Sequence, residues 1–168
     1  MTIMRFAFAL GFTLCTAAAS AASLAVFDFE LIDTSLDGQF NGPQKAEHDR
    51  LMAMGAVVRE KLAAAHRYDI IDIAPVAAKA EAANLQACGM CDAALARELG
   101  ADLAMTGTVQ KVSNLILNVN VYIRDAKTNA VIDAMSVDIR GNTDESWSHG
   151  INWLLRNKLL PVAGEAKP

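Results

Sequence analysis

Two cysteines stand three positions apart, at Cys88 and Cys91, and this spacing supports two kinds of chemistry. In an oxidising compartment it predicts a local disulfide that holds the turn between two helices. The alternative is thiol redox activity, because a sulfur at a helix N-terminus becomes more acidic and exchanges disulfides more readily. The pair does not directly follow a strand and no Trp precedes Cys88, unlike a thioredoxin site, so we favour the structural disulfide.

Acidic side chains gather where the first predicted strand ends. Asp28 and Glu30 fall on one face of that strand, and Asp33 follows in the next loop. Open α/β sheets place ligand crevices at this end of their strands, so the three residues are candidates for binding a cation or a small polar ligand. We favour the alternative, in which Asp28 caps or pairs locally while Glu30 and Asp33 are solvated. Their spacing does not match a calcium-binding loop.

Other combinations of reactive side chains do not form a recognisable site. Ser146 and His149 are helical neighbours without a Gly-x-Ser-x-Gly elbow, so the sequence predicts no catalytic residue. No histidine has metal-ligand spacing to another histidine or to the cysteines, so no metal site is predicted. The phosphate-binding glycine patterns are absent, and no cofactor is predicted.

Two tryptophans lie near the C-terminus, at Trp147 and Trp153. Six helical steps of 100° place them about 120° apart, so one can enter the core while the other stays partly exposed. An exposed tryptophan is a candidate anchor for a protein interface. A partly covered core position is the plainer interpretation, and we favour it.

The compartment follows from the first residues. Residues 1–22 combine Arg5, an apolar run and Ala19-Ser20-Ala21, which predicts a cleaved signal peptide, a single domain over 23–160 and a flexible tail over 161–168. The mature protein is then expected to be soluble and periplasmic, without stable membrane insertion. A net charge of −4 without any basic run excludes an electrostatic footprint for nucleic acid.

Hydrophobic patterning predicts a mixed α/β domain in the order βαβααβββα, with one five-stranded sheet packed by helices. The predicted strands span 24–32, 68–73, 103–109, 115–123 and 131–140, and the helices 43–65, 75–85, 92–100 and 142–158. In the first helix Leu51, Met54, Val58 and Leu62 form the apolar stripe, and Glu47 is expected on the surface. We expect Asn129 to be left-handed in a hairpin turn, and Asn142 with Glu145 to cap the last helix.

Several short segments, in this order and spacing, resemble the TolB N-terminal and CsgG-like periplasmic domains over about residues 24–160. They are Ala25-Val26-Phe27-Asp28-Phe29, Tyr68-Asp69-Ile70-Ile71-Asp72, Leu99-Gly100-Ala101-Asp102-Leu103, Thr106-Gly107-Thr108, Arg124-Asp125 and Thr128-Asn129. The segment from Cys88 to Trp147 is similar to a family of small secreted proteobacterial proteins of unknown function. The resemblance implies a Gram-negative periplasmic domain that contacts other envelope proteins, as an accessory to an envelope or periplasmic oxidation system.

The leading hypothesis is therefore a non-catalytic accessory domain that binds envelope proteins, with an unknown oligomeric state. Pairing of a partner segment with an open sheet edge is one physical route to binding. A thiol-disulfide protein using Cys88 and Cys91 is the first alternative. A small-ligand or cation-binding protein using the acidic end of the first strand is the second.

The disulfide hypothesis is tested by mass, redox potential and melting. In the mature protein, from which Cys15 is removed with the leader, we expect an alkylating agent to add no mass before reduction and two adducts after it. A structural disulfide should show a reduction potential below about −300 mV, and reduction should lower the melting temperature. A potential near about −200 mV with unchanged melting would contradict the structural role and favour thiol exchange.

Overall fold

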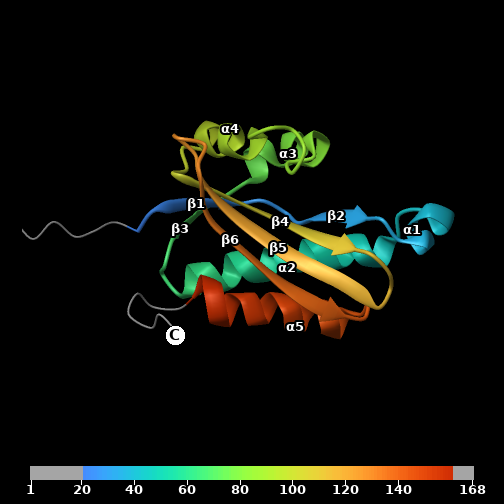
Figure 1. Ribbon diagram of the computed structural model, residues 1–168. Coiled ribbons are helices and arrows are strands. Elements are labelled where there is room, and N and C mark those ends of the chain that lie inside the picture. Colours follow the sequence, from blue (N-terminus) through green and yellow to red (C-terminus); the bar gives the residue numbers. More distant parts are fainter. Residues whose placement is uncertain (1–20, 161–168) are drawn as a thin grey trace, which may run out of the picture.

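The computed structural model describes residues 21–160, in which a sheet lies between helices on its two faces (Figure 1). The predicted leader and tail lie outside the described residues, apart from Ala21 and Ala22. In chain order the elements are β1 (Ser23–Val26), β2 (Glu30–Asp33), α1 (Leu36–Asn41), α2 (Lys45–Ala64), β3 (Asp69–Ile71), the 3₁₀ turn η1 (Ala74–Val76), α3 (Ala77–Ala83), α4 (Cys91–Glu98), β4 (Leu103–Lys111), β5 (Ile116–Asp125), β6 (Val131–Arg140), α5 (Asp144–Leu154) and the π-helical turn η2 (Leu155–Leu159).

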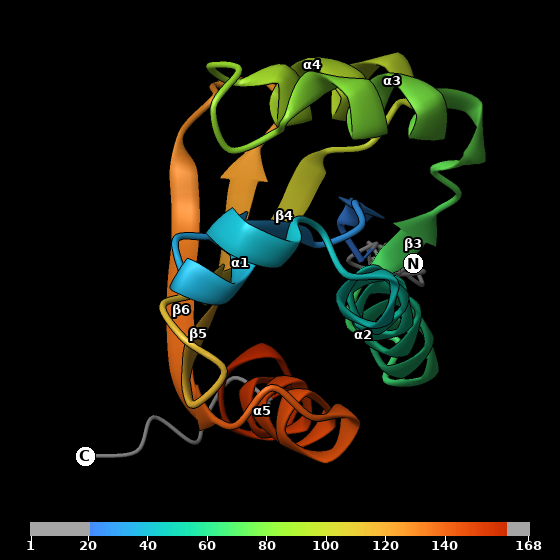
Figure 2. The same ribbon diagram turned by 90° about the vertical axis from the view of Figure 1, so that its right-hand side faces the viewer.

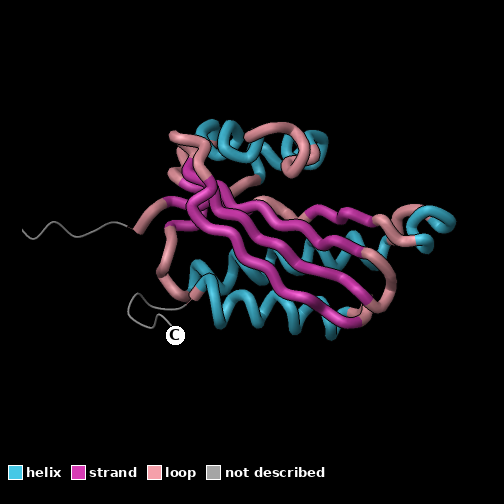
Figure 3. The backbone as a smooth tube through the Cα atoms, viewed as in Figure 1, coloured by secondary structure: helices cyan, strands magenta, loops and turns pink. Residues whose placement is uncertain are grey.

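One mixed sheet contains all six of these strands (Figure 3). The strand order is β3-β1-β4-β5-β6, and β2 pairs with β4 beyond β1. The strands β1, β2 and β3 join the sheet in parallel, whereas β4, β5 and β6 form an antiparallel meander. The predicted class, a single mixed sheet packed by helices, is confirmed.

The predicted strand over 24–32 is two strands, which makes six where the sequence predicted five. Val26 lies opposite Met105, and Glu30 lies opposite Thr108. The segment from β1 to β2 therefore advances four residues where β4 advances three. One extra residue against a neighbouring strand is a β-bulge, and it interrupts the ladder locally. The Phe27 amide still donates to the Met105 carbonyl, so the two pieces follow one edge of β4.

Helices cover both faces of the sheet. α2 and α5 pack on one face and α3 and α4 on the other, near one end (Figure 2). The larger core joins the sheet to α2 and α5, and the smaller core lies under α3 and α4. The predicted stripe of α2 is buried, as are the odd positions of β5 from 117 to 123. Asn129 has the predicted left-handed conformation, with φ of 62°.

The segment 34–43, predicted as a loop, contains the helix α1. Ser35 caps it by accepting a hydrogen bond from the Gly38 amide at 3.0 Å. No residue of α1 is buried. Because no apolar stripe packs against the core, the hydrophobic periodicity could not reveal this helix.

The glycine of β4, Gly107, allows the Phe29 ring to lie directly against the strand. A Cβ atom at this position would overlap ring atoms of Phe29, which is itself 2% exposed. We expect Gly107→Ala to lower the free energy of unfolding by roughly 1–3 kcal/mol, as overpacked cores do. Urea denaturation of Gly107→Ala, Phe29→Leu and the double variant checks this. In the Phe29→Leu background the smaller side chain at position 29 should relieve most of the cost of Gly107→Ala. An equal cost in both backgrounds would contradict this explanation.

Candidate functional site

The three acidic candidates separate into different contacts. Asp28 forms an ion pair with Arg59 at 2.8 Å, and the Glu30 carboxylate accepts the Leu85 amide at 2.6 Å. Asp28 and Glu30 nevertheless line one cavity of about 190 Å³ between the bulge, α2 and α3. Asp33 is not part of it, because it faces Lys111 at 3.1 Å.

The other predicted residues lie on separate elements. Cys88 and Cys91 form a disulfide at the start of α4, with Cα atoms 5.8 Å apart. Both tryptophans belong to α5; Trp147 is buried in the core, whereas Trp153 is 39% exposed. Ser146 donates its hydroxyl to the Arg140 carbonyl at 2.7 Å.

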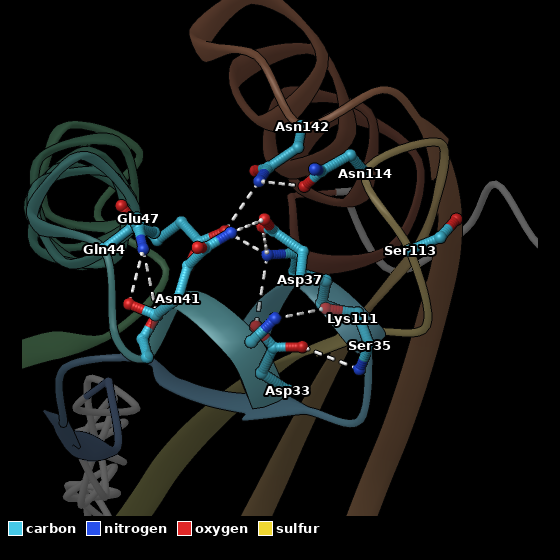
Figure 4. Close-up of polar contacts among 12 residues, drawn as sticks. Asp33, Ser35, Asp37, Asn41, Gln44, Glu47, Lys111, Ser113, Asn114 and Asn142 are labelled. Atoms are coloured by element: carbon cyan, nitrogen blue, oxygen red, sulfur yellow. Dashed lines mark hydrogen bonds and ion pairs between the residues drawn. The ribbon is translucent and has the colours of Figure 1, made fainter.

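A fully buried lysine, Lys111, organises the polar contacts where β4 ends (Figure 4). Lys111 is the last residue of β4, and its Nζ atom lies 2.7 Å from Glu47 Oε1, 2.9 Å from Asp37 Oδ2 and 3.1 Å from Asp33 Oδ2. These carboxylates come from α2, α1 and β2. We call the four residues the Lys111 cluster; one positive charge against three negative ones leaves it a formal charge of −2.

The prediction that Glu47 lies on the surface is wrong, since this side chain is 2% exposed. Glu47 precedes Leu51 by one helical turn and therefore shares the buried face of α2. Lys111 likewise continues the core-facing alternation of Met105 and Val109. Both patterns were present in the sequence, and they indicate a buried charge pair once the two elements are placed together.

Asn142 connects this cluster to α5, in place of its predicted role as a cap. Its amide donates to Glu47 Oε1 at 2.6 Å and to Asn114 Oδ1 at 3.0 Å, while its carbonyl oxygen accepts from Arg50 at 3.1 Å. The helix is capped instead by Thr143, whose hydroxyl accepts the Ser146 amide. The Asn142 side chain thus forms tertiary contacts, which the spacing of Asn142 and Glu145 along the sequence does not predict.

The ionisation of the cluster follows from its contacts. Burial alone would lower the pKa of Lys111, but the hydrogen bonds to Glu47, Asp37 and Asp33 outweigh it and raise the pKa above its usual value. The hydrogen bond from Lys111, assisted by one from Asn41, lowers the pKa of Asp37. Burial would raise the pKa of Asp33, but hydrogen bonds from Ser35 and then Lys111 lower it below its usual value. Lys111, Asp37 and Asp33 are therefore charged near neutral pH.

Exposed apolar side chains surround this charged cluster. α1 and the β4–β5 turn lie together at one end of the molecule (Figures 1 and 2). We define the apolar end as the five large exposed side chains of these two segments. They are Leu36 and Phe40 of α1, and Val112, Leu115 and Ile116 of the turn and the start of β5. Phe40 is 84% exposed and Leu115 72% exposed.

A concavity of about 780 Å³ opens within this end. Asp37 and Asn41 line it from α1, Glu47 from α2 and Leu115 from the turn. Glu47 Oε2 is buried there without a hydrogen-bond partner among the described residues. The lining is mostly polar and also contains Arg50, and its apolar side chains are Ala46 and Leu115. The Asp37 carboxylate, which is partly exposed, is the acidic group that a partner could reach there.

The Lys111 cluster joins three segments of the chain through charged contacts. The Lys111 ammonium is held by three carboxylates and is a poor nucleophile in its charged form. In the part of the chain that the structure describes, no cluster of three or more His, Cys, Asp or Glu residues could hold a metal ion. Within the same range, none of the helices has the length and hydropathy of a membrane span.

Residues 22–159 match DUF3280, described as "Protein of unknown function (DUF2380)", and the chain belongs to this family. Its fold is similar to that of lipoprotein GNA1162 from Neisseria meningitidis, with a TM-score of 0.53 and 18% identity over 87% of this chain and 99% of that one. The LpoB C-terminal domain from Escherichia coli aligns with a TM-score of 0.48 and 13% identity, covering 75% of this chain and 88% of that one. A PelC dodecamer subunit from Paraburkholderia phytofirmans aligns with a TM-score of 0.49 and 14% identity, over 85% and 92%. No curated protein matches the chain.

Removal of the central cation tests the energetic role of the cluster. We expect Lys111→Met to lower the free energy of unfolding by about 3–5 kcal/mol, because it leaves the buried Glu47 carboxylate without its cation. Lys45→Met is the matched control, since Lys45 pairs with Asp49 on the exposed surface of α2 and should cost less than about 1 kcal/mol. Similar costs for the two variants in urea denaturation would contradict the account.

The pH dependence of that cost tests its electrostatic origin. Asp33 and Asp37 have folded pKa values below their ordinary value of 3.8, so their contribution is present above about pH 4 and is lost as the pH falls through the folded values. The contribution of Lys111 is present below its ordinary pKa of 10.5 and is lost only as the pH rises through the higher folded value. We therefore expect the cost of Lys111→Met to shrink between about pH 7 and pH 3. A constant cost over this range would mean that lost packing, and not charge, is responsible.

Proposed function

We propose that this chain is a non-catalytic accessory domain of the cell envelope that binds another protein through its apolar end. The observation that carries the proposal is α1, a six-residue helix that buries no residue and exposes Leu36 and Phe40. Large apolar side chains gathered on a surface mark interaction sites, because leaving them in water is unfavourable. The leader predicted from the sequence supports export to the periplasm, and the relation to TolB N-terminal and CsgG-like domains remains part of the hypothesis.

The charge of this end defines the partner. The Lys111 cluster has a formal charge of −2, and Asp37 is partly exposed at the concavity. A second copy of the chain would bring a second acidic surface, and like charges at an interface are unfavourable. We infer that the partner is a different protein that presents a lysine or arginine between apolar side chains.

A second candidate function is small-ligand binding at the cavity between α2 and α3. The observation that favours it is that Asp28 and Glu30 line the same 190 Å³ space. Their carboxylates already contact Arg59 and backbone amides, so a ligand would have to be small and compete for these contacts.

Photo-crosslinking in the native host tests the proposed interface. A benzophenone-bearing phenylalanine analogue at Phe40 should form one dominant adduct with an envelope protein, and the same analogue at Ile132 should not. Ile132 is the matched control because it is a large exposed side chain on β6, away from the apolar end. Leu115→Asp in the Phe40 probe should reduce the adduct by about tenfold or more, since central anchor residues contribute most of the binding energy.

The salt dependence of binding to the partner that this crosslinking identifies is the second part of the test. Purified partner should bind more weakly as salt is raised, because opposite charges attract across the interface. Asp37→Asn removes the partly exposed carboxylate and loosens α1, so it should both weaken binding and reduce this salt dependence. Equal labelling from Phe40 and Ile132, or an adduct that consists of a second copy of this chain, would overturn the proposal.

A further inference from the structure

A second concave surface lies between α2 and α5, away from the exposed side of α1. It has a volume of about 500 Å³, within the range of ordinary ligand pockets. Its apolar lining comes from Ala53, Met54, Val57, Trp147 and Ile151. We call this surface the α2–α5 groove. Ala53 is exposed, so the groove is open to solvent at this alanine of α2.

Trp147 carries a hydrogen-bond donor that the fold does not use. The side chain is 1% exposed, yet its Nε1 atom has no acceptor among the described residues. Buried donors in folded proteins are nearly always paired, so an unpaired one requires an explanation. A ligand in the groove that offers an acceptor to the indole would supply it.

The charged side chains at the rim of the groove already have partners, and Asp49 pairs with Lys45 at 2.6 Å. Asp49 and Asp144 line it with Arg50. The Arg50 guanidinium is already engaged by Asp144 at 2.6 Å, by Asn142 at 3.1 Å and by the Trp147 ring at 5.7 Å. An anionic ligand would therefore meet two carboxylates and a cation that is already paired.

We propose that the α2–α5 groove binds an apolar side chain of a partner polypeptide together with its flanking peptide group. A peptide carbonyl accepts the Trp147 indole N–H, and a peptide N–H donates to a rim carboxylate of Asp49 or Asp144. The peptide group is neutral and carries both a donor and an acceptor, which matches the groove better than the anionic head of a fatty acid. The groove shares Ala46 and Arg50 with the concavity at the apolar end but contains none of the five side chains that define that end, so the proposal does not depend on the function proposed there.

The test uses N-acetylphenylalanine amide as the probe and the ¹⁵N–¹H correlation spectrum of the mature protein as the readout. The Trp147 indole N–H resonance should move downfield and saturate at millimolar probe, the affinity expected of a fragment of this size. The Trp153 indole, which does not line the groove, should stay unchanged and serves as an internal control. N-acetylglycine amide, which lacks the apolar group, should produce no saturable shift.

Two substitutions on one helix separate groove binding from general effects. Ala53→Phe fills the groove and should abolish the Trp147 shift, whereas Ala56→Phe, at an exposed position outside the groove, should preserve it. Leu115→Asp should leave the shift unchanged, so failure here is distinguishable from failure at the apolar end. The proposal would be overturned by the absence of a saturable shift of the Trp147 resonance, or by a shift that persists in Ala53→Phe. Tighter binding of decanoate than of N-acetylphenylalanine amide would also overturn it.

Discussion

One buried ammonium group determines how one end of this molecule is built. Lys111 brings together carboxylates from three segments, β2, α1 and α2. Removing these charges from water is costly, and the loss is offset only when every charge has a close partner. The helix α1 illustrates the dependence, since six residues without a buried side chain cannot persist through local interactions alone. The Lys111 cluster therefore acts as a positional constraint more than as a source of net stability.

The two proposed binding surfaces share this polar framework. Asn142 joins Glu47 of the cluster to Arg50, and Arg50 covers the Trp147 ring at the edge of the α2–α5 groove. Backbone hydrogen bonds between the β4–β5 and β6–α5 turns add a second connection, from Asn142 to Asn114 and from Gly141 to Leu115. A rigid polar centre with apolar side chains around it is the arrangement that preorganises an interface, because little side-chain freedom remains to be lost on binding.

Local patterns in the sequence predicted much of the scaffold. The stripe of α2 and the left-handed Asn129 each depend on neighbours along the chain, and they were confirmed. The bulge between β1 and β2 and the helix α1 lack such periodicity. The charged site was missed because its contacts join residues 64 positions apart, Glu47 with Lys111, and 95 positions apart, Glu47 with Asn142. Glu47 and Lys111 each continue an apolar pattern, so their burial could have been inferred, but their pairing required the fold.

Amide hydrogen exchange resolved along the chain tests most directly whether the Lys111 cluster holds the apolar end in place. The account predicts that the amides of α1 and of the β4–β5 turn are protected in the native protein and lose this protection in Asp37→Asn, while α3 and α4 keep theirs. Asp37 is partly exposed, so this substitution removes a contact without emptying the core. Exchange in α1 that is already fast in the native protein, or equally slow in both proteins, would contradict the claim that the buried lysine positions this end.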